Sequence, residues 1–133
     1  VDEGNNNAKF RAFFDNATTQ KVRYDVIGLS YYPYWIKKDY AETIADLQFN
    51  LNDMAQRYNK EVMIVEVGGE DDKIQNTYEL LVATIKAVKN VPNNKGIGVL
   101  YWEPQGARSW SHYALSAWLP DGKPSPALDA FKE

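Results

Sequence analysis

Hydrophobic and polar residues follow two different periods along this chain. Short apolar runs that end at Gly or Pro alternate with longer segments in which apolar residues recur every three or four positions. The short runs are Tyr24–Tyr32, Val62–Val67 and Ile97–Trp102. Runs of this length that are rich in β-branched residues are typical of strands buried on both faces, as in parallel sheets. The pattern therefore predicts three parallel strands.

The segments with the longer period have the spacing of amphipathic helices. Asp39 followed by Glu42 resembles a capping box, so a long helix is expected to begin there. Asp72 is a candidate N-cap for the helix that follows the second strand. The predicted helices cover residues 10–17, 40–58, 74–88 and 126–131.

The order of these elements is a helix followed by three strand–helix units. The strands recur at intervals of roughly 35 residues, which suits one unit of a (β/α)₈ TIM barrel. Since a barrel needs about eight strands, we expect part of a barrel, namely its last three βα units (strands 6–8). The alternative is a small three-stranded α/β layer, which would leave two open edges and an exposed apolar face.

Composition excludes several classes of function. The chain has 133 residues and a net charge of −3, which argues against a nucleic-acid or anionic-membrane partner. It has no cysteine, and a single histidine, His112, rules out a histidine-cluster metal site. No apolar run approaches the roughly 20 residues of a membrane span. The chain begins at Val1 and shows no signal peptide, so we expect a mature or excised piece.

The most informative position is Glu66, which closes the apolar run Val62–Val65 and precedes Gly68. A lone acid at the carboxyl end of a parallel strand lies where α/β barrels carry their chemistry. The alternative is an acid that only ends a strand in solvent. If Glu66 points into the barrel, strict alternation predicts that Ile64 and Val62 share its face.

The other strand ends supply groups suited to a sugar. Ser30 and Tyr32 fall in phase at the end of the first strand, and Trp102 ends the third. Hydroxyls and a carboxylate can bind sugar hydroxyls, while an indole covers the apolar face of a ring. Trp35 and Trp110 lie on loops, where they are either packing residues or further sugar platforms.

Three segments carry a resemblance to a known family. The segments Asp25–Trp35, Leu51–Val67 and Gly96–Pro104 resemble those of the arabinogalactan endo-β-1,4-galactanases of glycoside hydrolase family 53. Val1–Gly4 resembles the loop after the fifth strand in that family. The match is in family order and covers essentially the whole chain. It implies that residues 1–133 are the C-terminal part of a single (β/α)₈ catalytic domain.

The resemblance implies hydrolysis of internal β-1,4 links in the galactan side chains of pectin, with retention of configuration. It makes Glu66 the nucleophile and Ser30, Tyr32 and Trp102 substrate-binding residues, and Trp35 is added from its place on the loop. The family motif often continues with Thr or Ala and an aromatic residue, whereas this chain continues with Gly68. The resemblance also implies a secreted, bacterial-type protein that acts outside the cell, at the cell surface or in the periplasm.

Retaining hydrolysis needs a second carboxyl group about 5–5.5 Å from the nucleophile. In the family this acid/base is a glutamate on the fourth strand, upstream of Val1. Glu103 is the alternative within this chain, but alternation would then turn Trp102 out of the site. We therefore expect the chain alone to be inactive, and to pair with the missing N-terminal part or with itself.

No metal or other cofactor is expected. Some relatives bind calcium near the last loops, but the acidic segment 70–72 is more simply a helix start. The expected ligand is galactan or a galacto-oligosaccharide. Two alternatives remain open: a glycan-binding or truncated structural module without activity, and a retaining enzyme of the same clan that acts on another β-glycan.

Overall fold

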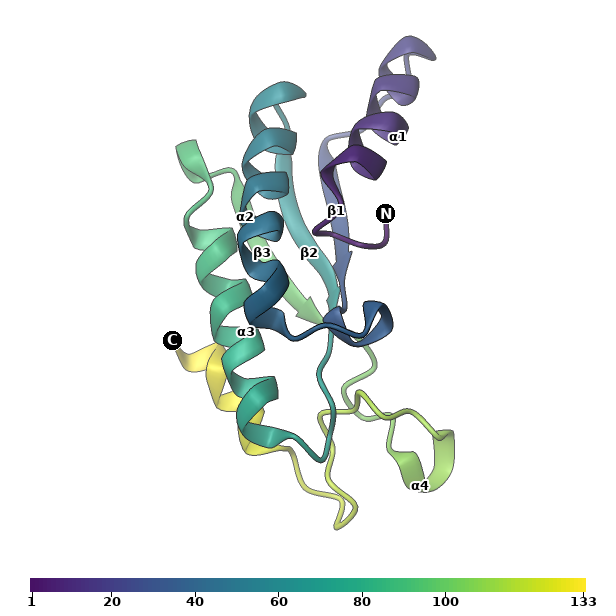
Figure 1. The fold of residues 1–133 in the computed structure, drawn as a ribbon, viewed down its shortest axis with the longest axis vertical. Coiled ribbons are helices and arrows are strands. Elements are labelled where there is room, and N and C mark those ends of the chain that lie inside the picture. The colour runs from purple at the N-terminus through teal and green to yellow at the C-terminus, as the bar shows by residue number, and fades with distance from the viewer.

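A computed structural model of the chain describes residues 1–133, in which helices pack against one face of a three-stranded sheet (Figure 1). The α-helices and strands are α1 (Asn7–Thr19), β1 (Val26–Tyr31), α2 (Tyr40–Arg57), β2 (Glu61–Val67), α3 (Ile74–Lys89), β3 (Gly96–Tyr101) and α4 (Arg108–Ser111). Short 3₁₀ helices cover Pro33–Ile36, Pro92–Asn94 and Pro126–Lys132. None of the helices combines the length and apolar character needed to cross a membrane.

The sheet has the order β1-β2-β3, and both neighbouring pairs are parallel. The three predicted strands are therefore confirmed, although β1 begins at Val26 rather than Tyr24 and β3 ends one residue before Trp102. The N-terminal segment lies along the free edge of β1 (Figure 1). There the Ser30 amide donates to the Val1 carbonyl over 2.9 Å, and the Gly4 amide donates to the Ser30 carbonyl over 2.8 Å.

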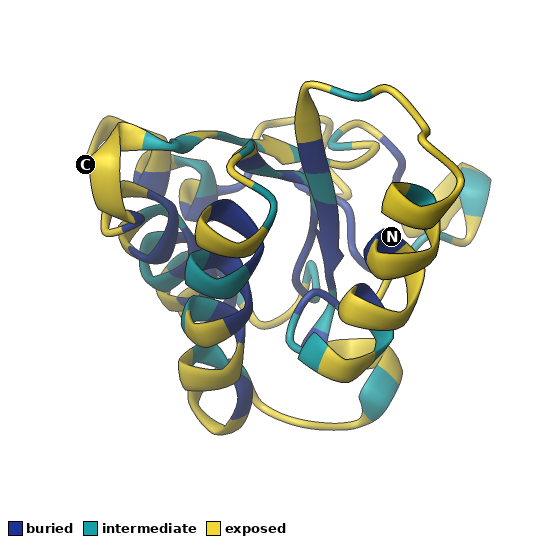
Figure 2. Cartoon of the chain, turned by 90° about the horizontal axis from the view of Figure 1, so that it is seen from above, coloured by how far each residue is buried: buried dark blue, intermediate teal, exposed yellow.

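The hydrophobic core lies between the sheet and the helices. Figure 2 shows buried residues on the strands and on the sides of the helices that face them. Because side chains alternate along a strand, only one set from each strand enters this core. The fully buried strand residues that pack with α2 and α3 are Ile27, Leu29, Tyr31, Val62, Ile64 and Val67. The Tyr31 hydroxyl lies 2.7 Å from the Thr43 hydroxyl on α2, which confirms that this set of side chains points toward the helices.

The N-cap predicted for α2 is present in the structure, whereas the one predicted for α3 is not. The Asp39 carboxylate accepts the Ala41 amide, and the Glu42 carboxylate accepts the Asp39 amide, so the predicted capping box is confirmed. The prediction of Asp72 as the N-cap of α3 was wrong. Lys73 occupies the N-cap position and makes no side-chain capping hydrogen bond. Its amide donates to the Glu70 carbonyl and closes a turn, so the N-cap lies one residue after Asp72.

The sheet face opposite the helices has no cover within this chain. Val26 and Leu100 on this face are exposed, and Met63 and Val65 are partly exposed. Exposed apolar surface of this kind in a soluble protein marks a surface that another segment or molecule covers. The face corresponds to the interior of a barrel.

We expect Gly96→Ala to destabilise the fold by about 3 kcal/mol, because a Cβ at residue 96 would collide with the carbonyl oxygen of Val88. Gly98→Ala is the matched control on the same strand, since its Cβ would lie 3.7 Å from the Met63 methyl group, an ordinary contact. Urea denaturation of both variants measures the difference. Equal free energies of unfolding would contradict the packing described for the start of β3.

Candidate functional site

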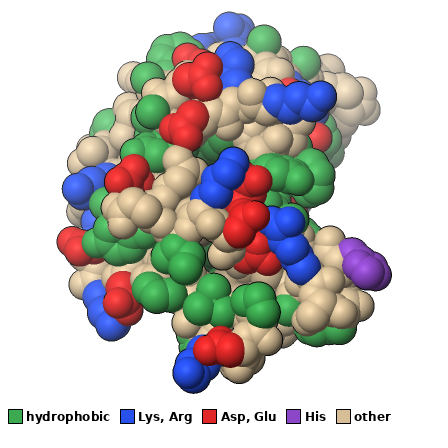
Figure 3. Space-filling model, turned by 60° about the horizontal axis from the view of Figure 1, so that its bottom comes forward, with side chains coloured by type: hydrophobic (Ala, Val, Ile, Leu, Met, Phe, Trp, Pro, Cys, Tyr) green, Lys and Arg blue, Asp and Glu red, His purple; other side chains and the backbone are tan.

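The candidate site lies where the three strands end, on the face that Figure 3 brings forward. Ser30, Tyr32, Glu66 and Trp102 come from the ends of β1, β2 and β3 or from the residue directly after them. The carboxyl ends of parallel strands meet at one edge of a sheet, so these side chains share one end of the molecule. The expected juxtaposition of strand ends is therefore present.

A bulge between β1 and β2 sets the direction of Glu66. The register pairs Leu29 with Ile64 but pairs Ser30 with Glu66, so Val65 is an extra residue on β2. Beyond the bulge, Tyr31 pairs with Val67, and both are fully buried toward the helices. Because Ser30 and Glu66 alternate with this pair, both point to the face away from the helices.

The expectation that Val62 and Ile64 share the face of Glu66 was therefore wrong. Both residues are fully buried in the helix-covered core. Strict alternation would have placed Glu66 in that core as well, and the inserted Val65 shifts the phase by one residue. Gly28 on β1 makes room for this insertion, since a Cβ there would come within 2.8 Å of the Val65 side chain.

Tyr32 is the direct partner of Glu66. Its phenol donates a hydrogen bond to Glu66 Oε2 over 3.3 Å. Burial raises the pKa of Tyr32 far above its ordinary value, and the neighbouring Tyr113 and Glu66 raise this pKa further. Tyr32 therefore remains protonated at working pH and acts as a donor to the carboxylate.

Glycine at position 68 allows this arrangement. A Cβ at Gly68 would come within 3.1 Å of the Leu115 carbonyl oxygen and 3.4 Å of the Tyr32 ring. The chain therefore passes closely between two groups that belong to the loops after β1 and β3. The sequence indicated only that glycine ends the strand here, while the structure shows that it also brings these loops together.

Tyr113 is a residue of the site that sequence reasoning did not single out. Its phenol lies beside that of Tyr32, and burial is the largest cause that raises the pKa of Tyr113. Its ring packs closely on Gly106, where a Cβ would come within 3.3 Å of Tyr113 Cδ1. The only sequence signal was the abundance of aromatic residues in the loop after β3.

Two interactions tie the loop after β3 to the loop after β2, and a third ties it to the end of β3. Arg108 pairs with Asp71 over 2.7 Å, and the Asp71 amide donates to the Ala114 carbonyl over 3.0 Å. The Tyr101 hydroxyl donates to the Leu115 carbonyl over 2.8 Å. Since Tyr113 lies between these anchored positions, the contacts hold its phenol near Tyr32.

The other aromatic residues lie farther out. Trp102 is 46% exposed, and its amide donates to the Val67 carbonyl over 3.0 Å at the end of the sheet. Trp35 packs edge-on against Tyr34, with 4.7 Å between the ring centroids, and is 63% exposed. Trp110 is also exposed. The structure therefore brings Ser30, Tyr32 and Glu66 together, whereas the Trp35 ring packs against Tyr34 instead.

Glu103 and His112, the remaining candidates, make no hydrogen bond or ion pair with Glu66. Glu103 is exposed and lies in a left-handed turn, where its carbonyl accepts the Gly106 amide. His112 is exposed and caps the end of α4. No group of three or more His, Cys, Asp or Glu side chains is arranged to hold a metal ion.

Comparison with known proteins decides the family. The model of glycosyl hydrolase family 53 matches residues 1–122. The chain belongs to this family. An uncharacterized protein in the bgaB 5′ region of Niallia circulans is 32% identical over 143 residues, which cover 90% of this chain and 34% of that protein. An arabinogalactan endo-β-1,4-galactanase of Humicola insolens is 29% identical over 106 residues, which cover 68% of this chain and 30% of the enzyme.

Solved structures of the family agree in fold. A structure from a study of two fungal β-1,4-galactanases superposes with a TM-score of 0.81 at 22% identity. The superposition covers 100% of this chain and 46% of the fungal chain. The three parallel strands with their helices therefore form part of a family 53 TIM barrel, as predicted. The chain spans about a third of the length of its curated relatives.

Removing the Arg108 guanidinium tests the connection between the two loops. We expect Arg108→Met to speed hydrogen exchange at the Asp71 amide by about tenfold, because the largely buried Asp71 carboxylate loses its partner. Arg57→Met is the control, since it removes an exposed pair with Asp53 within α2 and leaves the loops untouched. An unchanged exchange rate at Asp71 in the Arg108 variant would show that this ion pair does not hold the loops together.

Proposed function

We propose that this chain forms part of an endo-β-1,4-galactanase that cleaves internal links of galactan with retention, and that Glu66 is its nucleophile. Family membership and the galactanase names of several relatives support the substrate class. The observation that carries the residue assignment is the bulge at Val65, which turns Glu66 away from the helices and toward Tyr32.

The proposed reaction has two steps. Glu66 attacks the anomeric carbon of a galactose unit, the glycosidic C–O bond breaks, and a glycosyl ester forms on the carboxylate. The departing oxygen takes its proton from a carboxylic acid, which then deprotonates the water that hydrolyses the ester. The Tyr32 hydrogen bond keeps the Glu66 carboxylate oriented before attack.

Two further residues support substrate binding in this proposal. Ser30 is paired directly with Glu66 in the sheet and offers a hydroxyl on the same face. Trp102 offers a half-exposed indole on which the apolar face of a sugar ring can stack. Trp35 is proposed to contact the substrate farther along the rim.

The acid/base is proposed to be a glutamate on the fourth strand of the barrel, outside these residues. Glu103, the other acid near the site, lies in an exposed turn after the end of β3. No cofactor is needed for this chemistry, since two carboxyl groups are sufficient. We propose that the enzyme acts outside the cell, at the cell surface or in the periplasm, where polymeric galactan is accessible.

We expect the 133-residue chain alone to release no reducing sugar from galactan, and we expect activity once the chain is joined to the strands that carry the acid/base. In the joined protein, Glu66→Gln should lower kcat by at least about a thousandfold, because the amide cannot form the ester. Glu61→Gln is the control, since Glu61 is exposed at the opposite end of β2.

Normal turnover by the chain alone, or full activity of the Glu66 variant, would contradict the assignment. Assays on galactan, mannan and xylan distinguish this proposal from an enzyme of the same clan with another substrate. Binding of galacto-oligosaccharide without hydrolysis by the joined protein would favour the glycan-binding module instead.

The exposed sheet face generates a separate prediction. We propose that the other strands of the barrel cover Val26 and Leu100, and that the chain by itself associates through this face. Light scattering should therefore detect oligomers, and Leu100→Lys should shift them toward monomer because it places a charge on the apolar face. Phe49→Lys is the control, since Phe49 is equally exposed on α2. A monodisperse monomer of the unmodified chain would contradict this proposal.

A further inference from the structure

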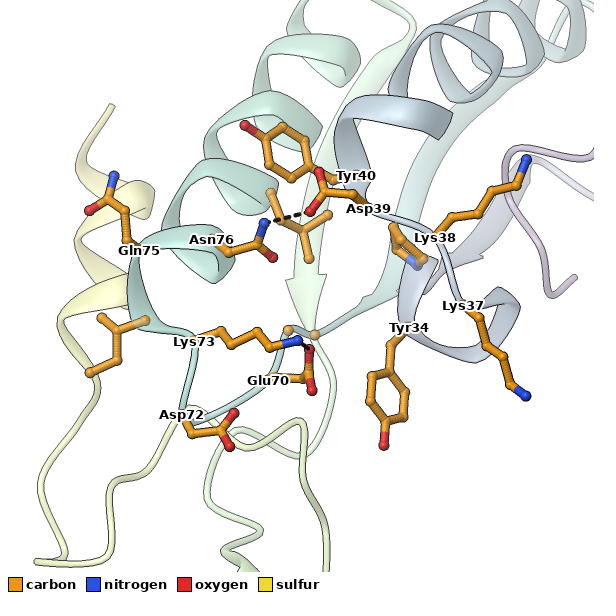
Figure 4. A pocket seen from close by; sticks show the side chains of 15 residues that line it. Tyr34, Lys37, Lys38, Asp39, Tyr40, Glu70, Asp72, Lys73, Gln75 and Asn76 are labelled. Carbon is orange, nitrogen blue, oxygen red and sulfur yellow. Dashed lines mark hydrogen bonds and ion pairs between the residues drawn. The ribbon is translucent and has the colours of Figure 1, made fainter.

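A cavity lies beside the strand ends, between the loop after β1 and the loop after β2 (Figure 4). Its volume is about 850 Å³, within the range of small-molecule sites. Its lining comes from residues 33–40, 68–76 and Leu80. Glu66 is not part of this lining, although Gly68 and Gly69, which follow it shortly, are.

Two pairs of polar side chains lie within this cavity. Asn76 on α3 donates to Asp39 at the start of α2 over 2.7 Å, and Lys73 pairs with Glu70 over 2.6 Å. Figure 4 shows these side chains pointing toward one another across the space, whereas Lys37 and Lys38 extend away from it. A metal ion would compete with Asn76 or Lys73 for a carboxylate, and an anion would compete with Glu70 for Lys73, so these two pairs favour an uncharged ligand.

An aromatic wall completes the cavity. The Tyr34 ring lines it and packs edge-on against Trp35, which extends the aromatic surface out of the cavity and along the rim. Oriented amide and carboxylate groups in one cavity with an aromatic ring suit a sugar, whose hydroxyls bond to the former while its apolar face contacts the latter. Neither Tyr34 nor the Asp39–Asn76 pair has a role in the proposed chemistry at Glu66.

We infer that this cavity binds a neutral oligosaccharide at a place separate from Glu66, with Tyr34 as the stacking ring and the Asp39–Asn76 pair as the hydroxyl-binding group. The inference rests on the proposed function only for the choice of β-1,4-linked galactose as the sugar. The cavity holds a glycan without cleaving it, since the Asp39 and Glu70 carboxylates are each already paired.

Calorimetric titration of the 133-residue chain with β-1,4-galactotriose tests the inference. We expect binding with a Kd of about 1 mM or tighter, and a loss of about tenfold in Tyr34→Ala and in Asn76→Ala, each of which removes one contact. The controls are Phe49→Ala, which changes an exposed aromatic residue on α2, and Asn16→Ala, which changes an exposed asparagine on α1. Glu66→Gln should bind as the unmodified chain does.

Each other outcome of the titration overturns the inference. Absence of heat at about 10 mM galactotriose, tenfold above a Kd of 1 mM, would exclude the site. Tighter binding of trigalacturonate or of calcium ions would show that the cavity takes charged ligands. Binding that is lost in Glu66→Gln but unchanged in the Tyr34 and Asn76 variants would move the sugar to the strand ends. Failure of the catalytic proposal would appear in the kcat of the joined Glu66 variant and would leave these titrations unchanged.

Discussion

Alternation of side chains along a strand restricts where a barrel can direct a carboxylate. In β2 the helix-covered core requires Val62 and Ile64 on one face, and strict alternation would then add Glu66 to the same core. An ionised carboxylate buried there without a partner would be very costly. The extra residue at Val65 removes this conflict, since it keeps the core intact and directs Glu66 to the opposite face beside Ser30.

The contacts around Glu66 depend on that bulge. Because Glu66 emerges opposite Ser30, the phenol of Tyr32 can reach its carboxylate from the loop after β1. The Tyr32 ring in turn lies on Gly68 and beside Tyr113, which belongs to the loop after β3. One change of strand register therefore brings three loops of the barrel rim into contact at a single carboxylate.

Local patterns were sufficient to predict the elements of the fold. Hydrophobic period and Gly or Pro boundaries located the strands, and the Asp39 capping box located the start of α2. The bulge was not predictable from β2 alone, because it depends on its neighbour: Gly28 on β1 leaves the space that Val65 fills. Long-range contacts also placed Tyr113 in the site. Asp72 failed as a cap for a local reason, because the chain turns once more at Lys73, whose amide donates to the Glu70 carbonyl.

The central claim is that the carboxylate displaced by the bulge is the one that bonds to the sugar. A 2-deoxy-2-fluoro galactobioside with a good leaving group slows hydrolysis of the glycosyl ester, so the intermediate can be isolated from the protein joined to its acid/base strands. Peptide mass spectrometry should then find the fluorosugar on Glu66. A label on any other residue, or complete hydrolysis of the probe with inversion of configuration, would contradict the account.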